Sequence, residues 1–188
     1  MATQDRLIES TQELLWERGY VGTSPKAIQQ RAGVGQGSMY HHFAGKPDLA
    51  AAALRRSAAQ MRALAERQLG GPGTAYERIE AYLLREREVL RGCRIGRMAQ
   101  DPEVVADPEL RAPVEETFAW LRGRIAEVIA EGTVAGELRP GPDPADTATA
   151  IVAVLQGGYV LARAAGSEEP FRQAVRGALG LLAALVRD

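Results

Sequence analysis

Hydrophobic residues recur at helical spacing along most of the chain, and glycine and proline separate the helical segments. Residues 2–18 carry Leu7, Ile8, Leu14 and Leu15 on one stripe, and a glycine follows them. Stripes of the same spacing predict helices over residues 46–69, 74–91, 108–135, 145–165 and 170–186. No segment has the alternation of a strand. The pattern therefore predicts an all-α protein of about nine helices, short ones included.

Two short helices are predicted between the first helix and the helix over residues 46–69. Ser24 is a good N-cap and Pro25 suits a first turn, so a helix is expected over residues 25–31. A segment around Gly33 interrupts it, and a second short helix follows over residues 36–42. This is the pattern of a helix-turn-helix, whose second helix fits the DNA major groove. The alternative is an αα-corner inside another kind of helical protein.

Composition narrows the class of protein. Of 188 residues, 46% are hydrophobic and 25% are charged, which suffices for a packed core. The single cysteine excludes an internal disulfide framework and a cysteine-based zinc site. No secretion leader is recognisable, and the most apolar stretch, residues 148–155, is too short to span a bilayer. We expect a cytoplasmic protein with no membrane partner, no metal and no cofactor.

Charge is distributed unevenly, although the formal net charge is only −1. Residues 1–70 contain nine Lys/Arg and six Asp/Glu, a balance of +3, and the remainder has a balance of −4. No acidic residue lies between Glu17 and Asp48. A basic N-terminal region on an acidic body can face phosphate without a basic protein overall. Chance clustering is the alternative explanation.

The residues of the first fifty positions resemble a known family. They occur in one register, without a gap: Gly19-Tyr20, Thr23-Ser24, Ile28, Ala32-Gly33-Val34, Gly37, Tyr40, His42-Phe43, Lys46 and Leu49. This region, about residues 5–50, closely resembles the DNA-binding domain of the TetR family of transcriptional regulators. The resemblance implies a helix-turn-helix domain over residues 1–48 and an effector-binding and dimerisation domain over residues 49–188, with residues 46–69 as the connecting helix.

The resemblance also implies a set of DNA contacts. Hydroxyl, amide and basic side chains near the two short helices would hold phosphate or read bases: Thr23, Ser24, Lys26, Gln36, Gly37, Ser38, Tyr40, His41 and Lys46. Gln36 is best suited to adenine. His42 and Phe43 are interpreted mainly as packing residues. Gln29 replaces a usual alanine, and Gly35 replaces a usual serine or threonine ahead of the recognition helix, so an N-cap is lost there.

An effector pocket in the second domain is the family's other implication. Bulky or polarisable residues are the candidates for its wall: Tyr82, Cys93, Met98, Phe118, Trp120 and Tyr159. Taken singly, each is more often a core residue than a pocket residue. Arg91, Arg94 and Arg97 recur every third residue and could meet an anionic ligand, or could form a solvated helix end.

The last two predicted helices are candidates for a dimer interface. Their apolar and small residues suit a four-helix bundle between two chains: Ile151, Leu155, Gly158, Phe171, Val175, Leu179 and Leu182. An ordinary core within one chain is the alternative. A symmetric dimer would place two recognition helices on an inverted repeat.

Together these features predict a homodimeric repressor that a small-molecule effector releases from a palindromic double-stranded DNA operator. A helix-turn-helix regulator controlled by a protein partner, or by no effector, is the alternative. An enzyme is a third class, but the sequence has no catalytic triad motif, phosphate loop or paired-carboxylate motif. We therefore expect no enzyme activity.

Overall fold

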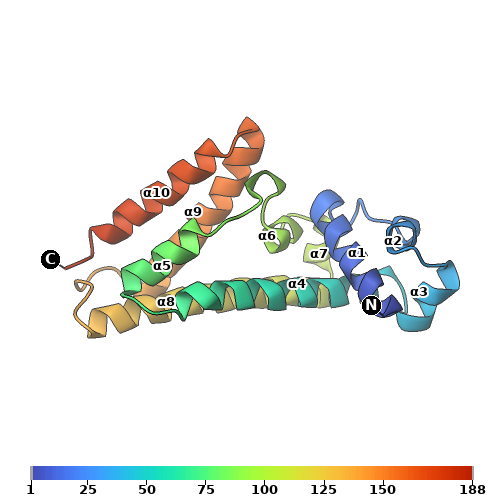
Figure 1. Ribbon diagram of the computed structural model, residues 1–188, viewed down its shortest axis with the longest axis horizontal. Helices are drawn as coiled ribbons and strands as arrows, with labels where there is room; N and C mark the ends of the chain where they lie inside the picture. The colour runs from blue at the N-terminus through green and yellow to red at the C-terminus, as the bar shows by residue number, and fades with distance from the viewer. Residues whose placement is uncertain (1, 188) are drawn as a thin grey trace. The chain divides into compact units, whose positions relative to one another are not determined.

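The chain folds into helices that form two compact units. The computed structural model describes residues 2–187, and in them ten α-helices and one 3₁₀ turn follow one another (Figure 1). Unit 1 contains residues 1–61 and 93–117, and unit 2 contains residues 62–92 and 118–188. The predicted all-α class is confirmed. The predicted domain division after residue 48 remains a prediction.

Unit 1 contains the N-terminal helices and a returning segment from the middle of the chain. Its elements are α1 (Thr3–Arg18), α2 (Pro25–Ala32), α3 (Gln36–His42), the first part of α4 (Lys46–Leu69), α6 (Arg94–Met98), α7 (Pro102–Ala106) and the start of α8 (Pro108–Val134). The bounds of α3 and α4 match the prediction. Two short helices, α6 and α7, lie between residues 93 and 107, and Asp101 begins the second of them at Pro102.

Helix α1 is fixed in unit 1 by its apolar stripe and by polar contacts to α4. Leu7, Leu14 and Trp16 are buried. Gln12 Nε2 donates to Ser57 Oγ at 2.8 Å and to Gln60 Oε1 at 2.9 Å. Buried side-chain amides need such partners, so these bonds set the position of α1 along α4.

Unit 2 contains the end of α4, then α5 (Ala75–Leu84), the 3₁₀ turn η1 (Val89–Arg91), most of α8, α9 (Pro144–Ala165) and α10 (Glu169–Ala183). The single helix predicted over residues 74–91 is wrong in its second half. Arg85 has an extended backbone, φ −54° and ψ 150°, and ends α5. Leu90, which lies beyond this end, is exposed.

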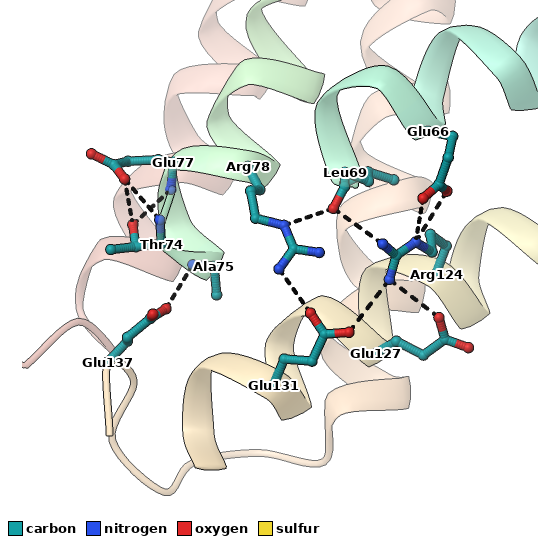
Figure 2. A network of polar contacts seen from close by, with 10 residues as sticks. All are labelled: Glu66, Leu69, Thr74, Ala75, Glu77, Arg78, Arg124, Glu127, Glu131 and Glu137. Carbon is teal, nitrogen blue, oxygen red and sulfur yellow. Dashed lines mark hydrogen bonds and ion pairs between the residues drawn. The ribbon is translucent and has the colours of Figure 1, made fainter. Parts of the chain in front are cut away.

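A polar network holds the C-terminal end of α4 against α5 and α8 (Figure 2). The Leu69 carbonyl accepts from Arg78 Nε at 2.7 Å and from Arg124 Nη2 at 3.4 Å. Arg78 and Arg124 both contact Glu131, at 2.7 and 3.6 Å. Two cations at a helix C-terminus are favourable, because the unpaired carbonyls there carry partial negative charge.

Helix α9 is a core helix of unit 2, packed against α10 and η1. At 22 residues and a mean hydropathy of 1.4, it is long and apolar enough to cross a membrane by length and composition alone. The apolar stretch over residues 148–155 lies inside this helix, whose bounds agree with the helix predicted over residues 145–165. Seven of its residues, among them Ile151 and Leu155, are buried within the chain, as in core helices generally.

Candidate nucleic-acid interface

Helices α2 and α3 are joined by a tight turn. The Ser24 hydroxyl accepts a hydrogen bond from Ala27 N at 3.2 Å and caps α2. At the other end, Gly33 has the left-handed conformation, φ 62° and ψ 40°, and Val34 N donates to Gln29 O at 3.1 Å. This is a glycine C-cap, and it turns the chain directly into α3. Ser24 is exposed, so its O–H can still donate to a phosphate.

Helix α3 presents one polar face and buries the other. Gln36, Gly37 and Tyr40 are exposed at helical spacing, whereas Met39 is fully buried. A Cβ at Gly37 would meet nothing within 4 Å, so the helix surface there is open. The exposed face therefore starts with an amide side chain at the helix N-terminus, which is the part of a recognition helix that contacts base edges.

The residues around α3 agree only partly with their predicted roles. Lys26 and His41 are exposed, and Ser38 is half-buried. Phe43 is buried as expected, but His42 is exposed and does not pack in the core. Gly35 is the N-cap of α3 and supplies no side-chain hydrogen bond, as expected from the glycine at this position.

Thr23 does not offer its side chain to DNA. It is 2% exposed, and its hydroxyl donates to Gly19 O at 2.7 Å. The predicted hydroxyl contact from Thr23 to phosphate is therefore wrong. The side chain instead closes the loop between α1 and α2, since its donor is used inside unit 1.

Lys46 is held in place by an aromatic ring. Its Nζ lies 3.8 Å from the centroid of the Tyr20 ring, within cation–π distance. Burial, and then the nearby carboxylates of Glu103, Asp107 and Asp101, raise the pKa of the Tyr20 phenol, so the ring stays neutral. A preplaced ammonium at the start of α4 is a suitable phosphate contact, because less side-chain entropy remains to be lost on binding.

Asp101 is a structural residue of this site that sequence reasoning missed. Its Oδ2 accepts from Tyr20 N at 2.8 Å and from Val21 N at 3.1 Å, and its Oδ1 accepts from Glu103 N at 3.2 Å. The same carboxylate therefore caps α7 and holds the loop that leads into α2. The Asp-Pro pair signalled only the helix start, since the partner amides lie about eighty positions away in sequence.

Arg6 is a second residue that sequence reasoning missed. It lies beside the α2–α3 turn, with Nη1 4.0 Å from where a Cβ on Gly33 would be. Its Nε has no hydrogen-bond partner among the described residues. By contrast, Arg31 forms a bidentate ion pair with Glu17 at 2.7 and 2.9 Å. Arg6 is thus a further candidate for phosphate contact.

The six effector candidates lie in both units. Cys93 and Met98 belong to unit 1, where Met98 is fully buried and Cys93 Sγ accepts from Gly96 N at 3.2 Å. The other four belong to unit 2: Tyr82, Phe118, Trp120 and Tyr159. Among these, Tyr82 and Tyr159 are buried, and Trp120 is half-buried with Arg62 5.9 Å from its ring centroid.

The arginines at every third position are engaged inside the chain. Arg91 pairs with Glu88 at 3.1 Å. Arg94 pairs with Glu13 at 2.7 Å and lies 3.8 Å from the centroid of the Trp16 ring. Both guanidinium groups are therefore already paired with carboxylates of the same chain.

The predicted dimer residues form the core of unit 2 instead. All seven are buried within the single chain: Ile151, Leu155, Gly158, Phe171, Val175, Leu179 and Leu182. A Cβ at Gly158 would lie 3.1 Å from the Phe171 ring, so this glycine allows α9 and α10 to approach each other. Their burial leaves little side-chain surface for a second chain, which favours the alternative of an intrachain core for these seven residues.

A capped α2, a glycine turn and an exposed polar α3 define a helix-turn-helix DNA-binding protein. Residues 7–53 match the family model of bacterial regulatory proteins of the tetR family, and residues 74–178 match that of the tetracyclin repressor-like C-terminal domain. The chain belongs to the TetR family of transcriptional regulators.

Individual relatives agree with this assignment along nearly the whole chain. The transcriptional regulator AcuR of Cereibacter sphaeroides is 27% identical, covering 90% of this chain and 80% of its own. A TetR regulator from Chloroflexus aurantiacus has a similar structure, with a TM-score of 0.88, 27% identity and coverage of 98% and 96%. A cysteine mutant of CifR, solved with 26-bp operator DNA, has a TM-score of 0.79, 25% identity and coverage of 93% and 94%.

Proposed function

We propose that this regulator is a homodimeric repressor that binds a palindromic operator through α3 and is released by a small-molecule effector. The exposed face of α3 carries the proposal, because it begins with Gln36 at the helix N-terminus and is flanked by Ser24, Lys26 and Lys46. Base edges would be read by Gln36, with an adenine as its best partner. Phosphates would be held by Ser24, Lys26, Tyr40, Lys46 and Arg6.

An exposed apolar face on α9 and α10 supports the dimer. Val160 and Leu161 on α9 are 54% and 56% exposed, and Leu181 on α10 is 77% exposed. Gly157 and Gly177 are open, with nothing within 4 Å of a Cβ. Small residues beside exposed leucines permit close packing of helices from a second copy. This face lies on the side opposite to the seven core residues.

Control by an effector is supported by the family's C-terminal domain, which this chain contains. A ligand that binds the DNA-incompetent state more tightly would shift the population away from the operator. The regulator would act on chromosomal DNA in the cytoplasm. Control by a protein partner is the second candidate, since the exposed face on α9 and α10 could also bind another protein.

The test is selection of bound sequences from random duplex DNA with purified protein at a fixed salt concentration. We expect an inverted repeat with half-sites about one helical turn apart. The selected operator then serves as the probe in a screen for compounds that release the protein.

Two outcomes would contradict the proposal in different parts. Weak, salt-sensitive binding without a consensus would show that α3 does not read sequence. A clear operator, combined with a ligand that binds the protein without changing its affinity for that operator, would reject effector control and leave the DNA-binding role in place.

A further inference from the structure

Unit 2 encloses a guanidinium group that has no carboxylate partner among residues 2–187. Arg87 follows the end of α5, and its Nη atoms donate to the carbonyls of Leu83 at 2.7 Å, Arg85 at 2.8 Å and Tyr82 at 2.5 Å. Its Nε is buried without a hydrogen-bond partner. The carbonyls satisfy part of the guanidinium but do not neutralise its charge.

Two aromatic rings lie beside this charge, and a third ring packs on one of them. The Arg87 guanidinium carbon lies 5.3 Å from the centroid of the Tyr82 ring on α5 and 5.9 Å from that of Phe171 on α10. The Tyr159 ring on α9 packs on Phe171, with a centroid distance of 4.7 Å. The rings supply an apolar surface, and Figure 1 shows the three helices that carry them in unit 2.

A second guanidinium lies on the same ring. The Arg85 guanidinium carbon is 5.6 Å from the Tyr82 centroid, and its Nε is likewise buried without a partner in the described chain. Burial, and then the like charge of Arg85, lower the pKa of Arg87. The neighbouring carboxylates do not offset this charge, because Glu86 is exposed and Glu88 pairs with Arg91.

We propose that Arg85, Arg87 and the rings of Tyr82, Tyr159 and Phe171 form a subsite for an organic oxyanion, a carboxylate or phosphate on an apolar body. A buried cation is costly unless it is paired, and an oxyanion would accept from the two free Nε–H groups while its body lies on the rings. The role of Arg87 as a cap of α5 accounts for the hydrogen bonds of its Nη atoms. It does not explain why the Nε atoms of Arg87 and Arg85 are buried without a partner in the described chain. This inference rests on the proposed effector control and gives the chemical class of the effector.

The test compares matched pairs of ligands that differ in charge but little in shape. Phenylacetate with phenylacetamide, and hexanoate with hexanamide, are titrated by calorimetry, together with phenyl phosphate and inorganic phosphate. We expect the anions with an apolar body to bind at least about tenfold more tightly than the amides. Phenylacetate and phenyl phosphate then distinguish a carboxylate from a phosphate ligand.

Variants locate the binding. Arg85→Gln should weaken binding of the preferred anion by about tenfold. The Arg85 side chain donates no hydrogen bond within residues 2–187, so the melting temperature of this variant should stay near that of the unmutated protein. Arg122→Gln, an exposed change of equal charge on α8, is the matched control. Nitrogen-15 spectra of the arginine Nε–H groups provide a second readout, in which the Arg85 and Arg87 signals should shift on addition of the anion.

The proposal is overturned if amides bind as tightly as acids, if no anion of the panel binds, or if Arg85→Gln and Arg122→Gln behave alike. It is also overturned if binding leaves both Nε–H signals unmoved. Operator affinity measured on the same unliganded preparation separates the two proposals. A protein that binds the anions through Arg85 but no operator retains the subsite and loses only the proposed repressor function.

Discussion

Under the proposed function, the side chains near α3 divide into those that would read bases and those that would hold phosphate. Gln36 is the exposed amide at the start of α3, and Lys46 is a cation fixed over the Tyr20 ring. Thr23 shows how burial overrides a motif, since its hydroxyl is consumed by the Gly19 carbonyl. The chemistry of a residue type predicts a contact only when the side chain reaches the surface.

The two kinds of contact should respond differently to alanine substitution. Lys46→Ala should weaken binding to all DNA sequences and reduce the salt slope by about one, because one phosphate contact is lost. Gln36→Ala should relax preference at one base pair, at a cost of about 1–3 kcal/mol. Fluorescence anisotropy at several salt concentrations, on the operator and on single-base variants, measures both. Identical behaviour of the two variants would show that α3 is placed wrongly on DNA.

At the scale of elements, helix ends decide where the chain differs from its prediction. Local signals placed α3 and α4 correctly, because Gly33, Gly35 and Lys46-Pro47 mark helix ends in the sequence itself. The end of α5 has no such signal. Arg87 caps the carbonyls there in a conformation stabilised by rings from α9 and α10, and these contacts are distant in sequence.

The seven residues of α9 and α10 named as interface candidates from the sequence lie in the core of unit 2 for a related reason. Hydrophobicity identified a helix that is apolar on several sides, but could not tell which side packs within the chain. The larger residues Phe171, Val175 and Leu182 face the core of unit 2. The face left exposed carries Val160, Leu161 and Leu181, which were not among the residues predicted for an interface.

Helix α3 begins without a side-chain cap, and this can be repaired. Gly35 has φ −76° and ψ 162°, which any residue can adopt, and a Cβ there meets nothing within 4 Å. Gly35→Ser should therefore stabilise the folded state by roughly a few tenths of a kcal/mol, by accepting from an unpaired amide of the first turn, since glycine is itself a tolerated N-cap. Chemical denaturation measures the change. Gly35→Ala is the control, and an equal gain in it would assign the effect to glycine entropy rather than to capping.

The network at the end of α4 predicts a pH dependence. Hydrogen bonding to Arg78, then the charge of this arginine, lowers the pKa of Glu131 below its usual 4.5. A carboxylate with a lowered pKa in the folded state stabilises the fold above its unfolded-state value, and this contribution is lost as the pH falls through the folded-state value.

Glu131→Gln should therefore lower the melting temperature slightly near neutral pH, and the difference from the unmutated protein should shrink as the pH falls through the folded-state pKa of Glu131. The effect is small because the Glu131 side chain is 53% exposed and is screened by salt. Differential scanning calorimetry across this pH range is the measurement. A difference that persists at the acidic end would assign the loss to packing instead of charge.

At the scale of the whole molecule, the proposed function depends on a second copy of the chain. Leu161→Glu combined with Leu181→Glu places charge on the exposed apolar face and should convert the proposed dimer to a monomer in sedimentation experiments. Operator affinity should then fall sharply, because each chain would bind one half-site alone. Val134→Glu on α8, where the valine is 89% exposed, is the matched control. A dimer that survives the double change would place the interface elsewhere.

The contact between Gly19 and Asp101 constrains how this sequence can diverge. Gly19 has φ 77° and ψ 177°, a conformation that is nearly exclusive to glycine, and a Cβ there would lie 3.0 Å from Asp101 Oδ2. The loop that Asp101 binds depends on the glycine at position 19, but the glycine does not depend on the aspartate. A lineage can lose the aspartate and keep the glycine, but a lineage that loses the glycine must also reshape the loop that the aspartate binds. Close homologues should therefore include glycine without aspartate, and never aspartate without glycine, at these two positions.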